Sequence, residues 1–318
     1  MEIQSAEPPK GLICPLVTPL KGSHVDTASL RRLIEHVMGS VDAVLLNGPV
    51  WGEGLALSRE ERLNLVEAAL DIVRGRCPVL ISITGNTAKE TSLILSEFDH
   101  LIYRYNYPGP IFWVDAPICY HSNRNLPQFY KALPLETPFE FLLYNDPNLV
   151  RRFKKSMYHK NIRTSVLKKL SENKRICGLI YTGTIKRSLD YQRAVRYHQD
   201  FRIYDGDEKN FLDRPSSNGV LAGGSNFLPI AWREVTYSSL NVYDTQRTYS
   251  DHIYQIWEAG KMLRKFYNLY CKEPAAIVKQ ILQIMGIISD GRTVDSRKGL
   301  SRAKVEHINR VLKKYSII

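Results

Sequence analysis

Cysteine is scarce in this chain of 318 residues. Its five cysteines stand far apart and no two form a CxxC pair. This spacing excludes a disulfide-stabilised secreted scaffold and argues against a zinc or redox motif. Each lies in an apolar run, so we expect reduced core residues of a cytoplasmic protein; they are Cys14, Cys77, Cys119, Cys177 and Cys271.

Long apolar runs and paired histidines are also missing. No segment approaches the roughly 18 apolar residues of a membrane span, and the start MEIQSAEPPKGL has no apolar signal-peptide core. The eight histidines form no HxxxH or HxH pair, and no GxGxxG follows the first apolar run. We therefore expect no membrane association, no metal and no cofactor.

Positive charge is concentrated in one segment. The formal net charge is +12, and residues 151–175 hold ten Lys or Arg against one Glu. Because the rest of the chain is close to neutral, this charge distribution argues against a general nucleic-acid binder. Two interpretations of the segment stay open: Arg151 and Arg152 attract a small anionic ligand or an acidic partner, or the segment is solvated surface.

Eight short apolar runs of strand length recur along the first 223 residues. They span residues 12–17, 43–47, 78–83, 110–115, 139–145, 176–182, 201–205 and 219–223. Segments with helical spacing separate most of them. Strands that are apolar on both faces and alternate with helices indicate a parallel sheet covered by helices. Eight such units favour an α/β fold closed as a (β/α)8 TIM barrel over an open doubly wound sheet.

The strand pattern stops near residue 229. Helical spacing then continues over about 229–237, 246–270, 274–285 and 301–315. We therefore predict a barrel over residues 1–228 and a C-terminal helical domain over residues 229–318. The second part would pack on the barrel or form an oligomer contact.

Several short sequence motifs follow one another along the chain. They are PLVTP (15–19), GPVWGEGLALSREER (48–62), RGRCPVLISITGNTAKET (74–91), YNDP (144–147), YDGDE (204–208), GVLAGGSNFLP (219–229), EPAAIVKQILQIMGI (273–287) and GLSRAKVEHINRVL (299–312). Together they resemble the dihydrodipicolinate synthase and N-acetylneuraminate lyase family of class I aldolase-type barrels. The resemblance spans almost the whole chain and implies homo-dimers or homo-tetramers.

The family's catalytic lysine has no counterpart. In the family, a lysine on the sixth strand forms a Schiff base with pyruvate or a pyruvate-containing substrate. The family pattern Gly-Ile-Lys aligns without a gap to Gly178, Leu179 and Ile180. The resemblance thus places Ile180 at the lysine position, and a hydrocarbon side chain cannot condense with a carbonyl. The next lysine, Lys186, is expected on the surface of the following helix.

The substrate loop of the family has changed as well. Its two threonines correspond to Val50 and Trp51, which offer no hydroxyl, and its first glycine corresponds to Pro49. Gly52 is retained. Trp51 could fill the space of a lost ligand or form one wall of a new apolar pocket.

The remaining positions of the family site are retained only in part. Tyr144 matches the family tyrosine that moves protons beside the Schiff base, although it could equally be a packing residue. A tyrosine that a neighbouring subunit contributes falls at Cys119, with Tyr120 one residue away. Leu149 stands where the synthases have arginine. Leu221 precedes AGGSN (222–226), which closes the substrate site in the family and could alternatively cradle a phosphate.

Three functional hypotheses follow. We favour a dihydrodipicolinate synthase- or N-acetylneuraminate lyase-like protein without Schiff-base chemistry, acting as a binding or regulatory homologue. The second is an enzyme of altered chemistry that acts on a small anionic substrate through Tyr144 and the basic segment. The third is a lyase or synthase that uses an unexpected lysine.

Overall fold

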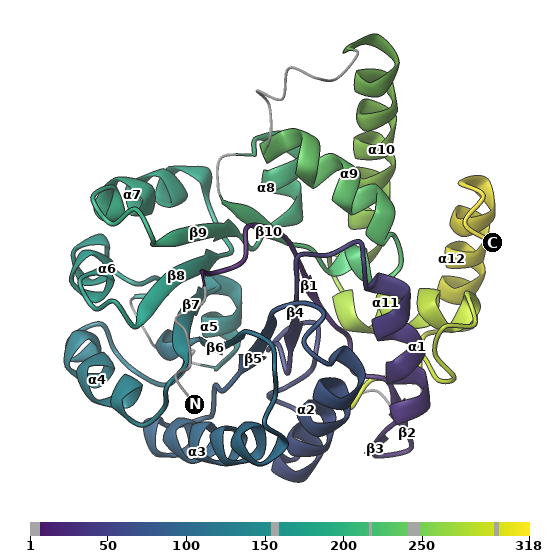
Figure 1. Cartoon of the computed structure of the whole chain (residues 1–318). Helices are drawn as coiled ribbons and strands as arrows, with labels where there is room; N and C mark the ends of the chain where they lie inside the picture. The colour runs from purple at the N-terminus through teal and green to yellow at the C-terminus, as the bar shows by residue number, and fades with distance from the viewer. Residues whose placement is uncertain (1–6, 154–158, 216–217, 241–248, 296–298) are drawn as a thin grey trace.

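Eight parallel strands close into a barrel in the computed structural model (Figure 1). The structure describes residues 7–153, 159–215, 218–240, 249–295 and 299–318. Around the barrel the strand order is β1-β10-β9-β8-β7-β6-β5-β4, and β1 pairs with both β10 and β4. This closure confirms the predicted (β/α)8 barrel and excludes the open sheet. The strands are β1 (Gly11–Pro15), β4 (Ala43–Leu46), β5 (Val79–Ser82), β6 (Ile111–Asp115), β7 (Glu140–Asn145), β8 (Ile176–Tyr181), β9 (Arg202–Asp205) and β10 (Gly219–Leu221).

Helices surround the barrel, as Figure 1 shows. Several begin at a polar residue whose side chain accepts a hydrogen bond from the first turn, for example Ser58 from the Glu61 amide and Asp207 from the Asn210 amide. These caps fix where each helix starts after its strand. The helices are α1 (Thr27–Val37), α2 (Arg59–Val73), α3 (Ala88–Tyr105), α4 (Leu126–Ala132), α5 (Pro147–Phe153), α6 (Thr164–Ser171), α7 (Ile185–Val195) and α8 (Glu208–Asp213).

The described residues after 228 include four helices, which form a C-terminal extension. They are α9 (Pro229–Leu240), α10 (Tyr249–Tyr270), α11 (Pro274–Ile284) and α12 (Arg302–Lys314), close to the ranges expected from the sequence. Residues 246–248 of the expected second helix lie outside the described residues. Phe227, just after β10, makes edge-on ring contacts with Phe266 and Tyr270 of α10, so the extension packs on the barrel. A boundary at residue 228 stays a prediction.

Short elements complete the fold. A two-stranded hairpin of β2 (Leu20–Lys21) and β3 (His24–Val25) precedes α1, and three 3-10 turns occur at η1 (Pro117–Cys119), η2 (Leu133–Leu135) and η3 (Gly223–Asn226). Within the described ranges no helix has the combination of length and apolar character needed to span a bilayer. The cysteines are free, and four are buried; the expectation of a core position is wrong for Cys271, which follows α10 and is exposed.

Candidate functional site at the barrel mouth

Tyr144 and Ile180 lie side by side near the C-terminal ends of their strands, where (β/α)8 barrels carry their sites. Tyr144 on β7 is the register partner of Ile180 on β8, and paired residues of neighbouring strands point to the same face of a sheet. Ile180 is fully buried and Tyr144 is 3% exposed. At this level of the barrel, the hydrocarbon side chain of Ile180 therefore lies next to the phenol of Tyr144.

The phenol of Tyr144 is held in its protonated form. Burial raises the pKa of Tyr144 well above its ordinary value, and the charge of nearby Asp146 raises it further. The Thr182 hydroxyl offsets only part of this effect. Tyr144 can thus donate a hydrogen bond, but it is a poor general base near neutral pH.

The backbone of the loop of residues 47–54 is sterically constrained. Asn47 and Glu53 both adopt left-handed backbone angles, with φ of 55° and 53°. A Cβ on Gly54 would lie 2.0 Å from the Asn47 carbonyl oxygen, so only glycine fits there. The Thr18 hydroxyl donates to the Gly52 carbonyl at 2.7 Å. This backbone fixes the partly exposed side chains of Val50 and Trp51 that the sequence assigns to the substrate loop.

Trp51 packs toward the C-terminal extension. Its ring meets Tyr270 of α10 edge-on, with centroids 5.6 Å apart, and a Cβ on Gly223 would lie 2.3 Å from the indole. The indole thus joins the loop after β4 to the end of β10 and to α10. These contacts favour the space-filling interpretation of Trp51 over a free pocket wall.

Glu53 at the end of the same loop forms a buried ion pair with Lys279 of α11. Lys279 is fully buried and Glu53 is 9% exposed. Glu53 also accepts a hydrogen bond from the Val294 amide at 2.7 Å, and Lys279 donates to the Arg292 carbonyl at 3.1 Å. Burial lowers the pKa of Lys279, and the Glu53 carboxylate counteracts that shift. The extension therefore anchors the loop directly.

Cys119 ends the turn η1 after β6, and Tyr120 is the residue that follows this turn. Cys119 is buried, and the Tyr120 hydroxyl donates to Oδ2 of Asp115 at 2.5 Å. Tyr130 and Thr84 donate to the same carboxylate at 2.6 and 3.0 Å. The sequence interpretation missed this network. The hydrogen bond to Asp115 turns the Tyr120 hydroxyl toward the barrel of its own chain. This orientation argues against Tyr120 as the tyrosine that a neighbouring subunit receives.

Arg151 and Arg152 are exposed on α5, directly after β7. Burial raises the pKa of Asp146, and the charge of Arg152 is among the influences that lower it, so Arg152 lies close to a carboxylate of its own chain. Arg175, at the other end of the basic segment, donates to the Thr137 and Phe139 carbonyls and has a structural role. Residues 154–158 lie outside the described residues.

The stretch Leu221 to Asn226 is a packed element. Leu221 is buried on β10 and pairs with Ile13 on β1. In the following turn η3, the Gly224 amide donates to Oε1 of Glu208 at 3.1 Å. The glycine-rich turn that could cradle a phosphate thus already binds a carboxylate of its own chain. The sequence placed Glu208 in the YDGDE motif but gave it no role.

Metal ligands are not clustered in the part of the chain that the structure describes. No three His, Cys, Asp or Glu side chains there converge in a way that could hold a metal ion.

The model of the dihydrodipicolinate synthetase family matches this chain over residues 8–308. The chain belongs to this family. A 4-hydroxy-tetrahydrodipicolinate synthase from Cytophaga hutchinsonii is 27% identical over 311 residues, which cover 93% of this chain and 92% of that protein. A 4-hydroxy-tetrahydrodipicolinate synthase from Sodalis glossinidius is 30% identical over 223 residues, which cover 68% of this chain and 70% of that protein.

Solved structures agree in fold. Dihydrodipicolinate synthase from Bacteroides thetaiotaomicron matches with a TM-score of 0.80 at 20% identity, over 97% of this chain and 99% of that chain. A prophage protein of the dihydrodipicolinic acid synthase family from E. coli, solved in complex with pyruvate, matches with a TM-score of 0.81 at 18% identity and the same coverage. These likenesses confirm the barrel and its C-terminal extension.

Two other lysines near this region are placed unfavourably for the chemistry that the dihydrodipicolinate synthetase resemblance implies. Lys186 is exposed in the first turn of α7, beyond the end of β8. Lys279 is buried but bound to Glu53 and to the Arg292 carbonyl. Neither lysine is thus both buried and free of an ion pair.

The buried carboxyl of Glu208 should make the stability of this protein depend on pH. Burial raises the pKa of Glu208 from 4.5 to about 7, although the Tyr270 hydroxyl and the backbone amides of Gly224 and Gly223 bind the carboxylate and lower it. Because the folded-state pKa is raised, this contribution to stability is fully present below pH 4.5 and is lost as the pH rises through 7.

Glu208→Gln should remove that dependence, because the side-chain amide of glutamine does not titrate in this range. Its oxygen can still accept the hydrogen bond from the Gly224 amide. Between pH 5 and pH 8 the wild type should lose about 2–3 kcal/mol more unfolding free energy than the variant. Urea unfolding at several pH values measures the difference. Parallel pH profiles for the two proteins would contradict the raised pKa.

Proposed function

We propose that this member of the dihydrodipicolinate synthetase family does not carry out Schiff-base chemistry and acts as a non-catalytic binding or regulatory homologue. The observation that carries the proposal is Ile180, fully buried beside Tyr144 on the strand where the family resemblance requires a lysine. An alkyl side chain has no electron pair with which to attack a ketone.

The other positions that the resemblance assigns to the site support the same conclusion. Val50 and Trp51 bring no hydroxyl to the loop after β4, and the indole is engaged with Tyr270. The raised pKa of Tyr144 keeps its phenol protonated, so it cannot readily accept the proton that a carbon acid would lose. The side chains of Val50, Trp51 and Tyr144 thus all argue against Schiff-base chemistry.

A second candidate function is an enzyme of altered chemistry on a small anionic substrate. The observation in its favour is the pair of exposed arginines, Arg151 and Arg152, on the helix that follows Tyr144. Guanidinium groups bind carboxylates and phosphates well, and the Tyr144 hydroxyl could donate to such a ligand. Keto acids, sugar acids and phosphorylated compounds are the classes to screen.

Assembly and location form part of the proposal. The family resemblance supports a homo-dimer or homo-tetramer, and the five free cysteines are compatible with the cytoplasm. The proposed role requires no cofactor and neither nucleic acid nor a membrane as partner.

Trapping with pyruvate and borohydride tests the main proposal. We expect the intact mass of the wild type to stay unchanged, because no amine is available at position 180 to form a reducible imine. The synthase from Cytophaga hutchinsonii, treated in parallel, is the positive control. A reduced pyruvate adduct on a lysine of the folded protein would overturn the proposal.

A thermal-shift screen separates the second candidate from the first. Strong stabilisation by one anion, abolished by Tyr144→Phe and weakened by Arg151→Gln, would favour the enzyme of altered chemistry. Turnover of that anion would then be the deciding measurement.

A further inference from the structure

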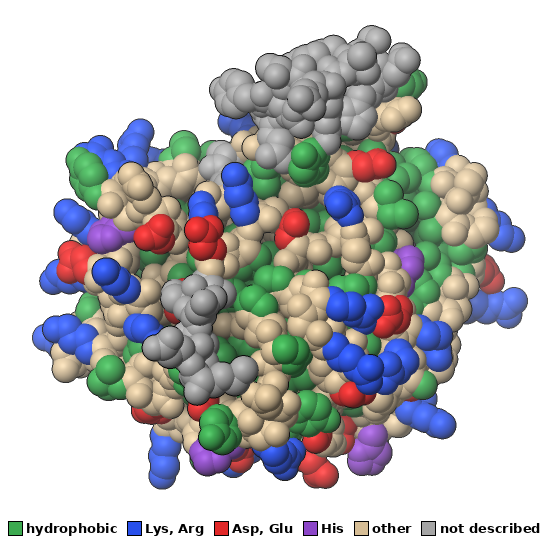
Figure 2. Space-filling view, in the orientation of Figure 1, with side chains coloured by type: hydrophobic (Ala, Val, Ile, Leu, Met, Phe, Trp, Pro, Cys, Tyr) green, Lys and Arg blue, Asp and Glu red, His purple; other side chains and the backbone are tan. Residues whose placement is uncertain are grey.

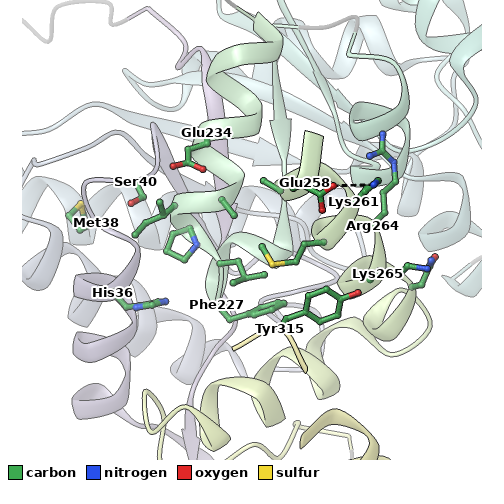
Figure 3. A pocket seen from close by; sticks show the side chains of 17 residues that line it. His36, Met38, Ser40, Phe227, Glu234, Glu258, Lys261, Arg264, Lys265 and Tyr315 are labelled. Carbon is green, nitrogen blue, oxygen red and sulfur yellow. Dashed lines mark hydrogen bonds and ion pairs between the residues drawn. The ribbon is translucent and has the colours of Figure 1, made fainter. Parts of the chain in front are cut away.

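A groove opens on the flank of the molecule, outside the barrel. Figure 2 shows hydrophobic side chains gathered between α10 and α12 on this side. The groove runs from α1 to these two helices and has a volume of about 1270 Å³ (Figure 3). Its lining residues include none of those assigned to the barrel mouth. A concave surface with an apolar floor and a few polar groups is typical of a small-molecule site.

The floor of the groove is apolar and comes from two parts of the chain. Phe227 and Leu228 belong to the turn after η3, and Met262 belongs to α10. Phe227 is 2% exposed, and its ring meets Phe266 of α10 edge-on, with the centroids 5.3 Å apart. These contacts form the floor without a ligand, as is usual for small-molecule sites.

One end of the groove carries positive charge. Lys265 on α10 is exposed and lines the groove. Tyr315, directly after α12, lines it as well, and Figure 3 shows its hydroxyl group turned toward the side where Lys265 stands. The Nζ atom of Lys314 lies 6.0 Å from the centre of the Tyr315 ring. A carboxylate at this end would therefore meet an ammonium group, a phenol and a second nearby cation.

Lys265 is the cation at this groove that is left for a ligand. Arg264 is paired with Asp213, and Lys261 is paired with Glu258. Lys265 has no ion pair within the ranges that the structure describes. Its charge is thus available to an anion from outside the chain.

The other sides of the groove do not attract an anion. Glu234 on α9 lines it, and Figure 3 shows Glu234 and Lys265 on opposite sides. At the α1 end, burial lowers the pKa of His36, and a hydrogen bond with the Phe227 backbone offsets only part of this shift. The imidazole is therefore neutral near pH 7, and the charge distribution orients a ligand with its acidic group toward Lys265.

We propose that this groove binds an amphipathic carboxylate, a molecule with one acidic head and an extended apolar body. The head lies between Lys265 and the Tyr315 hydroxyl, and the body covers Phe227, Leu228 and Met262. Such a ligand pairs a lysine that has no ion pair and removes the apolar floor from water. A hydrophilic anion lacks the second gain, and a neutral lipid lacks the first. This binding is independent of the chemistry at Ile180.

Calorimetric titration of the whole chain with straight-chain carboxylates, below their micelle concentrations, tests the ligand class. From hexanoate to octanoate to decanoate the affinity should rise about twofold to fourfold for each added methylene. Decanol and decyltrimethylammonium should bind about tenfold more weakly than decanoate. No saturable binding of decanoate, or equal binding of decanol, would overturn the proposal.

Substitutions at the positive end test the placement of the head. Lys265→Gln should weaken decanoate binding about tenfold and Tyr315→Phe about threefold. Lys265→Glu should reverse the preference in favour of decyltrimethylammonium. Lys272→Gln is the matched control, because Lys272 is exposed just after α10 and lies outside the groove, and it should leave the affinity unchanged. Equal losses in Lys265→Gln and Lys272→Gln would refute the site.

Methyl NMR of methionine-labelled protein tests the location. Met38 and Met262 line the groove, whereas Met285 follows α11 and does not. Decanoate should shift the signals of Met38 and Met262 and leave that of Met285 unchanged, with each signal assigned by a Met→Leu variant. A shift at Met285 without one at Met262 would contradict the site. Either result leaves the outcome of borohydride trapping untouched.

Discussion

Lys279→Met should lower the unfolding free energy by about 3–5 kcal/mol. The substitution removes the ammonium that neutralises Glu53, and this carboxylate is almost completely buried between the loop after β4 and α11. Methionine nearly matches lysine in length, so the loss reflects an uncompensated charge more than a cavity. Chemical denaturation at neutral pH, with the midpoint and slope fitted together, measures the effect.

The double variant Glu53→Gln/Lys279→Met is the control for that prediction. Glutamine can still accept the hydrogen bond from the Val294 amide, and no buried charge remains. We expect it to recover most of the lost stability, since replacing both members of a buried pair is far less harmful than removing one. Equal losses in the single and double variants would mean that packing, not charge, governs this contact.

Ile180→Lys should lower the unfolding free energy by about 3–5 kcal/mol at pH 7. The new ammonium would stand in a fully buried layer beside Tyr144, and burial depresses the pKa of such a lysine far below its ordinary value of about 10.4. Because the folded-state pKa is lowered, the penalty is largest at low pH and shrinks as the pH rises toward 10. Unfolding at pH 7 and pH 9 should show a recovery of about 2–3 kcal/mol.

Restoring the amine should not restore turnover. Val50 and Trp51 still offer no hydroxyl to a substrate carboxylate, and Tyr144 stays protonated. Ile180→Met separates the effect of charge from that of shape, and it should cost less than about 1.5 kcal/mol with no pH dependence. Robust pyruvate-dependent synthase or lyase activity of Ile180→Lys would show that the rest of the site is intact.

The fold could be predicted from the sequence because its signals are local. Each barrel strand is buried on both faces, so it reads as an uninterrupted apolar run, and the helices carry their own caps, such as Ser58 and Asp207. The apolar face of α1, with Leu30, Leu33, Ile34 and Val37, is buried as its spacing indicates. The short β2–β3 hairpin has only two residues per strand and no comparable pattern.

The candidate site was predictable only in part. Aligned motifs assign Ile180, Tyr144 and the loop of Val50 and Trp51 to the candidate site, and this assignment stays a prediction. The partners of buried charges did not follow from it. Glu208 meets Tyr270 across 62 residues, and Asp115 gathers hydroxyls from three segments, contacts that only the tertiary fold creates.

The link between Glu53 and Lys279 has a consequence for how this protein can be divided. A barrel ending at residue 228 would keep the Glu53 carboxylate while losing the ammonium and, with Tyr270, the ring on which Trp51 rests. The helices α10 and α11, which lie outside the barrel, therefore help to hold the loop after β4 in place. We therefore expect a chain cut at residue 228 to lose the conformation of the loop that carries Trp51 and Glu53.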